Sequence, residues 1–112
     1  MDTLVMKEIR VNVKDFSITP GSRYRDEGLK AHSGQEFREI FLEPIFENIE
    51  IVESIIVVNL DGTIGYGTSW LEEVFGGLAR KFGNDLVLNK IHFISDEEPY
   101  LIDDIKEYIK NA

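Results

Sequence analysis

Two hydroxyl-bearing residues, Thr68 and Ser69, follow a glycine-rich turn at the point where a helical pattern begins. The turn comes directly after the apolar run of residues 55–60. The first backbone N–H groups of a helix lack partners within the helix and carry partial positive charge. An anion, a phosphoryl group or a partner's carboxylate can therefore be held beside these two hydroxyls. The pattern suggests a regulatory module.

The residues that open the turn look like the first motif of haloacid dehalogenase-like phosphatases, Asp-x-Asp-Gly-Thr. Here the motif begins with Asn59, so an amide stands where those phosphatases have their nucleophilic aspartate. An amide cannot form the aspartyl phosphate intermediate. The chain is also short for that fold, and the sequence therefore argues against this phosphatase activity.

Residues 62–69 also have the spacing of a P-loop, and they lie between an expected strand and an expected helix. Thr68 occupies the position of the P-loop lysine, which removes the charge that reaches the outer phosphates of a nucleotide. No second magnesium-binding motif is evident in the chain. Nucleotide or phosphate binding by this turn remains an alternative function.

The run of residues 59–71 aligns without a gap with Asp-x-Ser-x-Val-x-x-x-Asp-Ser-Ser-Gly-Leu, the signature of STAS domains, the fold of anti-anti-sigma factors. Asp61 aligns with the first serine, Thr68 and Ser69 align with the serine pair, and Leu71 aligns with the closing leucine. Over roughly residues 5 to 95 the chain resembles bacterial STAS-like proteins of unknown function. The blocks that carry this resemblance are Thr19-Pro20-Gly21-Ser22-Arg23, Ser33-Gly34-x-x-Phe37-Arg38 and the glycine-rich block from Leu60 to Leu78.

The resemblance implies a binding switch rather than an enzyme. In anti-anti-sigma factors the second serine of the pair is phosphorylated by an ATPase-domain kinase, which is also the binding partner, and phosphorylation ends the association. Carried over, the acceptor is Ser69, with Thr68 less favoured, and the partner is an ATPase-domain serine kinase or an anti-sigma-like protein. Gly67 replaces the aspartate before the pair and Trp70 the glycine after it, which puts recognition by such a kinase in doubt.

We expect a protein partner to contact the turn, the start of the following helix and two arginines. The partner-binding residues are Asp61, Gly65, Tyr66, Gly67, Thr68, Ser69, Trp70, Glu73, Arg23 and Arg38. Large aromatic side chains near a helix start can anchor a partner. Core packing is the other explanation for Trp70.

Structural roles explain several of these residues equally well. Ser69 and Glu72 have the spacing of a capping box, which needs no further function. Asp61 can accept hydrogen bonds from turn amides. Arg23 and Arg38 can clamp a phosphate or carboxylate at the Ser69 region, or they can pair with the abundant acidic residues. A structural or self-association domain is therefore a further alternative.

The composition excludes several classes of function. The 112 residues include 12 Lys and Arg against 21 Asp and Glu, a formal net charge of −9, so we expect neither nucleic acid nor membrane as a partner. There is no cysteine, and His32 and His92 are far apart, so we expect no metal, redox chemistry or cofactor. No segment has the pattern of a signal peptide or a membrane span, which favours the cytoplasm. The length suits one domain over residues 1–112.

Three segments have the patterns of β-strands. Residues 7–13 alternate apolar and polar side chains, as in a half-buried strand near the edge of a sheet. Residues 54–60 are almost continuously aliphatic, which is typical of a central strand covered on both faces. Residues 86–94 are the third expected strand, with a bend at residues 89–90, and a short strand over residues 22–25 is a further possibility.

The first expected helix covers about residues 34–48, because Ser33 and Glu36 have the spacing of a capping box. Pro44 should kink this helix or end it early. The apolar stripe expected to face the core consists of Phe37, Ile40, Phe41 and Ile45.

A second helix follows the turn and stops near Gly83, and a third begins at Pro99. The apolar stripe of the second helix consists of Leu71, Val74, Phe75, Leu78 and Phe82. Gly76 and Gly77 in its interior suggest close approach of another backbone, either within the fold or from a partner. The order βαβαβα predicts an α/β fold, a single STAS-like domain whose small mixed or parallel sheet is flanked by about three helices.

Overall fold

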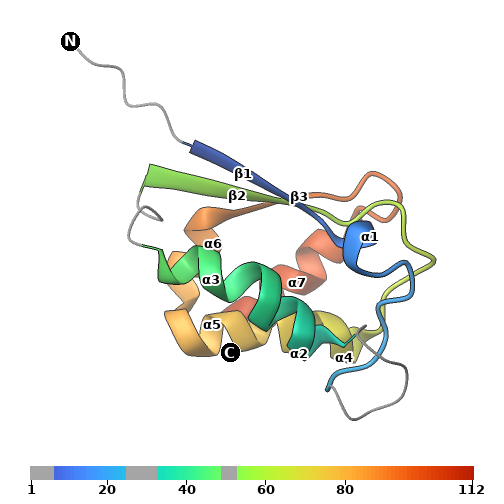
Figure 1. Cartoon of the computed structure of the whole chain (residues 1–112). Helices are drawn as coiled ribbons and strands as arrows, with labels where there is room; N and C mark the ends of the chain where they lie inside the picture. The colour runs from blue at the N-terminus through green and yellow to red at the C-terminus, as the bar shows by residue number, and fades with distance from the viewer. Residues whose placement is uncertain (1–6, 25–32, 49–52) are drawn as a thin grey trace.

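Three parallel strands form one sheet in the order β1-β2-β3 (Figure 1). The computed structural model describes residues 7–24, 33–48 and 53–112. The strands are β1 (Lys7–Asn12), β2 (Ser54–Asn59) and β3 (Ile91–Ile94). The α/β class is confirmed, the sheet is parallel, β1 lies at an edge and β2 lies in the centre.

The helical elements occupy the connections between the strands and the end of the chain. They are α1 (Val13–Phe16), α2 (Gly34–Phe37), η1 (Arg38–Leu42), α3 (Glu43–Glu47), α4 (Thr68–Leu71), η3 (Glu72–Gly76), α5 (Gly77–Phe82), α6 (Asn84–Lys90) and α7 (Tyr100–Lys110), in which η1 and η3 are π-helical. Among the described residues, no helix is long and apolar enough to span a membrane.

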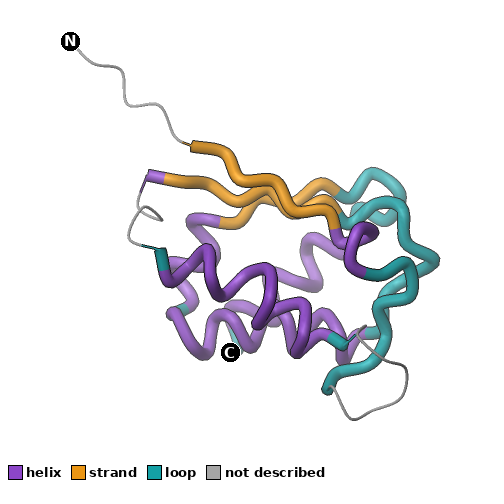
Figure 2. Tube along the Cα trace, in the orientation of Figure 1, coloured by secondary structure: helices purple, strands orange, loops and turns teal. Residues whose placement is uncertain are grey.

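The helices lie on one side of the sheet (Figures 1 and 2). Ile56 and Val58 of β2 are fully buried in the core. Side chains alternate along a strand, so Val57 faces away from the helices. Val57 is nevertheless 8% exposed, because Arg10 and His92 flank it in register. The expected helical cover on both faces is therefore found on one face only in the part of the chain that the structure describes.

The capping role expected of Ser33 at the first long helical region is confirmed. The Ser33 hydroxyl accepts a hydrogen bond from the Glu36 backbone N–H at 3.1 Å and donates one to the Glu36 carboxylate at 3.0 Å. The region continues past Pro44, which sits in the first turn of α3 and does not end it. The kink or early end expected at Pro44 is replaced by a π-helical segment, η1, which ends two residues before the proline.

This π-helical segment changes which side chains face the core. Phe37, Leu42 and Phe46 are buried, with spacings of five and four residues. Ile40 and Phe41, which were expected in the core, are 54% and 39% exposed. A turn with i to i+5 bonding advances the buried stripe by one residue, so the expected core positions are wrong at Ile40 and Phe41, whereas Ile45 is partly buried against the core.

The helix after the turn runs continuously over residues 68–82 through α4, η3 and α5, and we call it the long helix. It ends at Gly83, whose φ of +100° suits glycine, as predicted. Its buried stripe contains Leu71, Val74, Phe75 and Leu78, as predicted, with Phe82 partly buried.

The third expected strand is wrong over residues 86–90, which belong to α6. Only β3, the last part of that segment, is a strand. The alternation of Leu86 and Leu88 indicates a strand in isolation, but the helix directs Val87 into the core, where it is fully buried. The closing helix α7 begins after Pro99, as predicted.

The connection after α1 has no regular structure over residues 17–24. The possible strand at residues 22–25 is absent over residues 22–24, and Arg25 lies outside the described residues, as does His32. We call residues 17–24 the strap.

Candidate functional site

Three connections meet at the carboxyl end of the parallel sheet (Figure 2). They are the strap, residues 60–67 after β2, which we call the turn, and residues 95–99 after β3. Parallel strands finish at the same end of a sheet, so the topology brings these segments together. In open α/β sheets this end is the usual place for binding sites.

Asp61 joins the turn to the connection after β3. Its carboxylate accepts hydrogen bonds from the backbone N–H groups of Asp96 at 3.1 Å and Glu97 at 3.0 Å. The Asp61 N–H in turn donates to the side-chain oxygen of Asn59 at 2.9 Å. The structural alternative for Asp61, acceptance of bonds from turn amides, is thereby confirmed, although the amides belong to a neighbouring connection.

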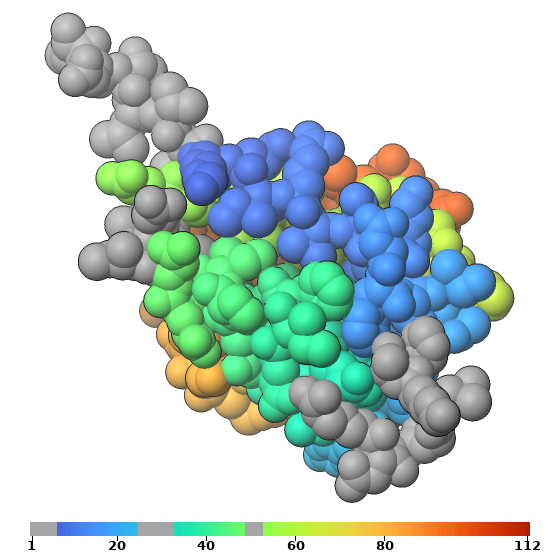
Figure 3. Space-filling model, viewed as in Figure 1, coloured from blue at the N-terminus to red at the C-terminus, as the bar shows by residue number. Residues whose placement is uncertain are grey.

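The strap lies against the turn through backbone contacts. Ile64 N–H donates to the Ile18 carbonyl at 2.7 Å, and Gly67 N–H donates to the Pro20 carbonyl at 2.9 Å. A Cβ atom on Gly67 would lie 2.6 Å from the carbonyl oxygen of Gly21, so glycine is required by the close approach. Figure 3 shows the contact on the right of the molecule, where blue atoms of the strap meet yellow-green atoms of the turn.

An open pocket of about 350 Å³ lies between the strap and the turn. Two isoleucines stand exposed here, Ile64 at 78% and Ile18 at 54%. Their backbones are hydrogen-bonded to each other, so the two residues are adjacent; Ile64 lines the pocket, and Ile18 directly precedes Thr19, which also lines it. The pocket is lined by Thr19, Pro20, Gly21, Ile64, Gly65, Tyr66 and Gly67.

Aromatic side chains support the turn from beneath. The Tyr66 hydroxyl donates to the Leu60 carbonyl at 2.7 Å, and burial raises the pKa of this hydroxyl. The Tyr66 ring lies 5.6 Å from Trp70, which in turn lies 5.2 Å from Phe37. Trp70 is fully buried, so core packing explains it and its ring does not reach the surface.

Thr68 and Ser69 are the first two residues of the long helix, and both are exposed. The capping position belongs to Gly67, whose backbone is extended and which has no side chain to cap with. The expected capping box of Ser69 and Glu72 is therefore wrong, because Ser69 lies inside the helix rather than before it. Its hydroxyl is left on the surface.

Three amides among residues 62–67, where a P-loop would bind phosphate, already have acceptors within the protein. Gly62 N–H donates to the Glu97 carboxylate at 2.6 Å, and the N–H groups of Ile64 and Gly67 donate to the strap. A P-loop uses such amides to cradle phosphates. In this conformation these three amides are already bonded and cannot donate to a phosphate.

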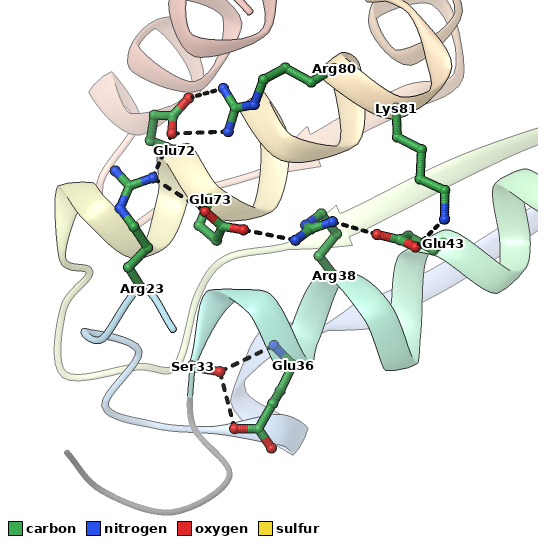
Figure 4. Close-up of polar contacts among 9 residues, drawn as sticks. All are labelled: Arg23, Ser33, Glu36, Arg38, Glu43, Glu72, Glu73, Arg80 and Lys81. Atoms are coloured by element: carbon green, nitrogen blue, oxygen red, sulfur yellow. Dashed lines mark hydrogen bonds and ion pairs between the residues drawn. The ribbon is translucent and has the colours of Figure 1, made fainter. Parts of the chain in front are cut away.

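An alternating chain of charged side chains runs along the helices beside the turn (Figure 4). Its central links are Arg23 to Glu72 at 2.7 Å, Arg23 to Glu73 at 3.3 Å, Arg38 to Glu73 at 2.7 Å and Arg38 to Glu43 at 2.5 Å. Both arginines therefore pair with acids, as the structural alternative predicted. In order, the chain is Arg80, Glu72, Arg23, Glu73, Arg38, Glu43, Lys81 and Glu47.

The ion pairs shift the pKa values of partly buried groups. The pKa of Glu72 is lowered, chiefly by the hydrogen bond from Arg80 and then by that from Arg23. The pKa of Arg23 is raised, chiefly by its hydrogen bond to Glu72. These groups are consequently charged together over the whole neutral range.

A protein-family model described as a STAS-like domain of unknown function (DUF4325) matches residues 33–101, more than half of the chain. The chain belongs to this family. The match contains β2, the turn, the long helix and β3, whereas β1 and the strap precede it. No curated protein and no solved structure matches the chain.

This STAS-like domain uses its paired glycines differently from the sequence expectation. A Cβ on Gly77 would lie 2.8 Å from Nε of Arg38, and one on Gly76 would overlap the Glu72 carboxylate. The two glycines therefore make room for charged side chains, and not for another backbone. The close backbone approach occurs instead at Gly34, where a Cβ would lie 2.7 Å from the Trp70 carbonyl oxygen.

The STAS-like domain separates the predicted partner-binding residues into two groups. Those at or beside the surface of the turn are Asp61, Gly65, Tyr66, Gly67, Thr68 and Ser69, and Arg23 reaches the same helix from the strap. The deeper group consists of Trp70 at 0%, Glu73 at 7% and Arg38, whose side chain is 14% exposed. The sequence expectation missed Ile18 and Ile64, since a single exposed isoleucine has no pattern that distinguishes it from a core residue.

Proposed function

We propose that this STAS-like domain is a non-enzymatic module that binds a protein partner through the turn, the strap and the first turn of the long helix. The observation that carries this proposal is the adjacent pair of exposed isoleucines, Ile18 and Ile64, beside an open pocket. Apolar anchors in the centre of an interface contribute most of its binding energy. A partner's apolar side chain entering this pocket would contact Ile64, which lines it, and the surrounding interface would cover Ile18.

We further propose that phosphorylation of Ser69 switches this binding, and that the kinase is an ATPase-domain partner. Ser69 is exposed and lies in the first turn of the long helix, within the proposed surface. Transfer from ATP would form a bond between Ser69 Oγ and the γ-phosphorus, release ADP and free one proton. The new group adds about two negative charges, which disfavours burial of this rim under a partner. The resemblance to anti-anti-sigma factors supports this choice of kinase.

Affinity capture from the native cell, with mass spectrometry of the captured proteins and of Ser69, tests the proposal. We expect an ATPase-domain protein that binds the wild type and Ser69→Ala but not Ser69→Asp or Ile64→Asp. Asn89→Asp is the matched control, because Asn89 is exposed on α6, at the opposite end of the molecule from the turn (Figure 1).

Two results would contradict the proposal. One is equal binding of the identified partner by the wild type and Ile64→Asp, which would place the interface elsewhere. The other is a rise in melting temperature with millimolar ATP or GTP and magnesium that depends on Thr68, which would favour the nucleotide-binding alternative.

A further inference from the structure

Arg23 connects the strap to the helix that carries Ser69. Its Nη1 atom contacts Glu72 at 2.7 Å and Glu73 at 3.3 Å. Each glutamate also pairs with a second arginine. Arg80 contacts Glu72 at 2.7 and 3.2 Å, and Arg38 contacts Glu73 at 2.7 Å. Arg23 can therefore leave both glutamates without leaving either carboxylate unpaired. A buried carboxylate without a partner would oppose such a movement strongly.

Ser69 occupies the same face of the helix as these glutamates. It precedes Glu72 by three residues and Glu73 by four, and residues at these spacings are neighbours on a helix surface. The strap lies against the start of this helix, since a Cβ on Gly67 would lie 2.6 Å from the Gly21 carbonyl oxygen, and Arg23 follows Gly21 by two residues. A phosphoryl group on Ser69 would stand next to Arg23.

We propose that phosphoserine at position 69 is bound within the same chain by Arg23, which moves to the phosphate from Glu72 and Glu73. This inference rests on the proposed phosphorylation of Ser69. A dianionic phosphate attracts a guanidinium more strongly than a carboxylate does, and the planar fork binds two phosphate oxygens at once. Repulsion between the phosphate and the two glutamates adds to the driving force, because Arg23 is the cation that separates them.

The consequence is a change in the rigidity of the binding surface as well as in its charge. Arg23 belongs to the strap, whose carbonyls at Ile18 and Pro20 accept hydrogen bonds from the turn. The backbone at Ser22 and Arg23 is held by the N–H groups of Gly34 and Gln35, so the Arg23 side chain moves while the strap backbone stays in place. The stronger pair with the phosphate holds the strap more firmly to the start of the long helix, so phosphorylation stiffens the surface that the partner would occupy.

The test uses the isolated domain carrying genetically encoded phosphoserine at position 69, with no partner present. Phosphorus NMR follows the second ionisation of the phosphate between pH 4 and 8. We expect its pKa to be lower by about 1 in the otherwise unchanged protein than in Arg23→Gln, because a neighbouring cation favours the dianion. Arg10→Gln is the matched control, since Arg10 is an exposed arginine on β1 that pairs with Glu8.

Hydrogen exchange reports how firmly the strap is held against the turn. We expect phosphorylation to slow exchange of the Ile64 and Gly67 amides several-fold, because both donate to the strap, and we expect Arg23→Gln to abolish this slowing. Arg23→Lys keeps the charge without the fork and should give an intermediate phosphate pKa, which preserves the test if Arg23→Gln folds poorly.

Equal phosphate pKa values in the phosphorylated wild type and Arg23→Gln would overturn the inference, and so would unchanged exchange of the two amides on phosphorylation. Failure of the partner capture, by contrast, would remove the proposed function and leave these measurements unaffected. The two results are therefore distinguishable.

Discussion

At the scale of single residues, the contact between Gly67 and Gly21 makes two neighbouring glycines differ in what they tolerate. A Cβ on Gly67 would lie 2.6 Å from the Gly21 carbonyl oxygen, whereas a Cβ on Gly21 would meet only the Thr19 carbonyl oxygen at 3.9 Å. The backbone of Gly67, with φ −74° and ψ 138°, is itself open to alanine. The steric effect of a Gly67 substitution therefore acts on the strap.

We predict that Gly67→Ala lowers the free energy of unfolding by about 1 to 3 kcal/mol, as overpacking commonly does. Gly21→Ala should change it by less than about 0.5 kcal/mol, the usual range for an open site. Urea unfolding of the two variants measures the difference. Equal stabilities would show that the strap does not lie against the turn in solution.

Two serines with the same sequence spacing show where residue patterns stop being predictive. Ser33 and Ser69 each precede a glutamate by three residues, but of the two only Ser33 caps its helix. At the second site Gly67 takes the capping position, because its N–H is committed to the Pro20 carbonyl and no side chain fits beside the strap. The position of the helix start depends on this contact between segments that are distant in sequence. The local spacing of residues carries no information about such a contact.

At the scale of elements, π-helical turns separate the predicted core from the observed one. The sequence correctly predicts that residues 34–48 are helical and where the helix begins. It assigns Ile40 to the core and omits Leu42, since periodicity assumes a uniform 3.6 residues per turn. The predicted strand is wrong over residues 86–90 for a related reason. Alternation over so few residues does not distinguish a strand from a short helix that buries Val87 in the core.

We predict that Leu42→Ala destabilises the protein by about 2 to 5 kcal/mol, because it empties space in the core around a fully buried side chain. Ile40→Ala should cost less than about 1 kcal/mol, since Ile40 is 54% exposed. Thermal or urea unfolding of both variants distinguishes the two stripes. A larger loss for Ile40→Ala would restore the regular helix that the sequence pattern predicts.

At the scale of the whole molecule, the charged chain joins segments that the sheet alone leaves apart. The strap contributes Arg23, the first helical region contributes Arg38, Glu43 and Glu47, and the long helix contributes the remaining members. The order of strands and helices is readable from local patterns along the sequence. The pairing of these charges is not, because it depends on which faces of two helices meet and on the space left by Gly77.

The charged chain should make stability depend on pH in a specific direction. Glu72 has a folded-state pKa below its usual 4.5, with Arg80 as the main cause, so its contribution is present above about pH 5 and is lost as pH falls through the lowered value. We predict that Glu72→Gln lowers the free energy of unfolding by about 1 kcal/mol at pH 7, a figure reduced for solvent screening of a side chain that is 26% exposed. The difference from wild type should shrink as pH falls below about 4.5, as urea unfolding at pH 7 and at pH 3 will show. Glu8→Gln, at an exposed pair on β1, should cost less than about 0.5 kcal/mol at either pH. If the loss of unfolding free energy in Glu72→Gln stayed constant from pH 7 to pH 3, the Glu72 side chain would stabilise the fold by packing and not by its charge.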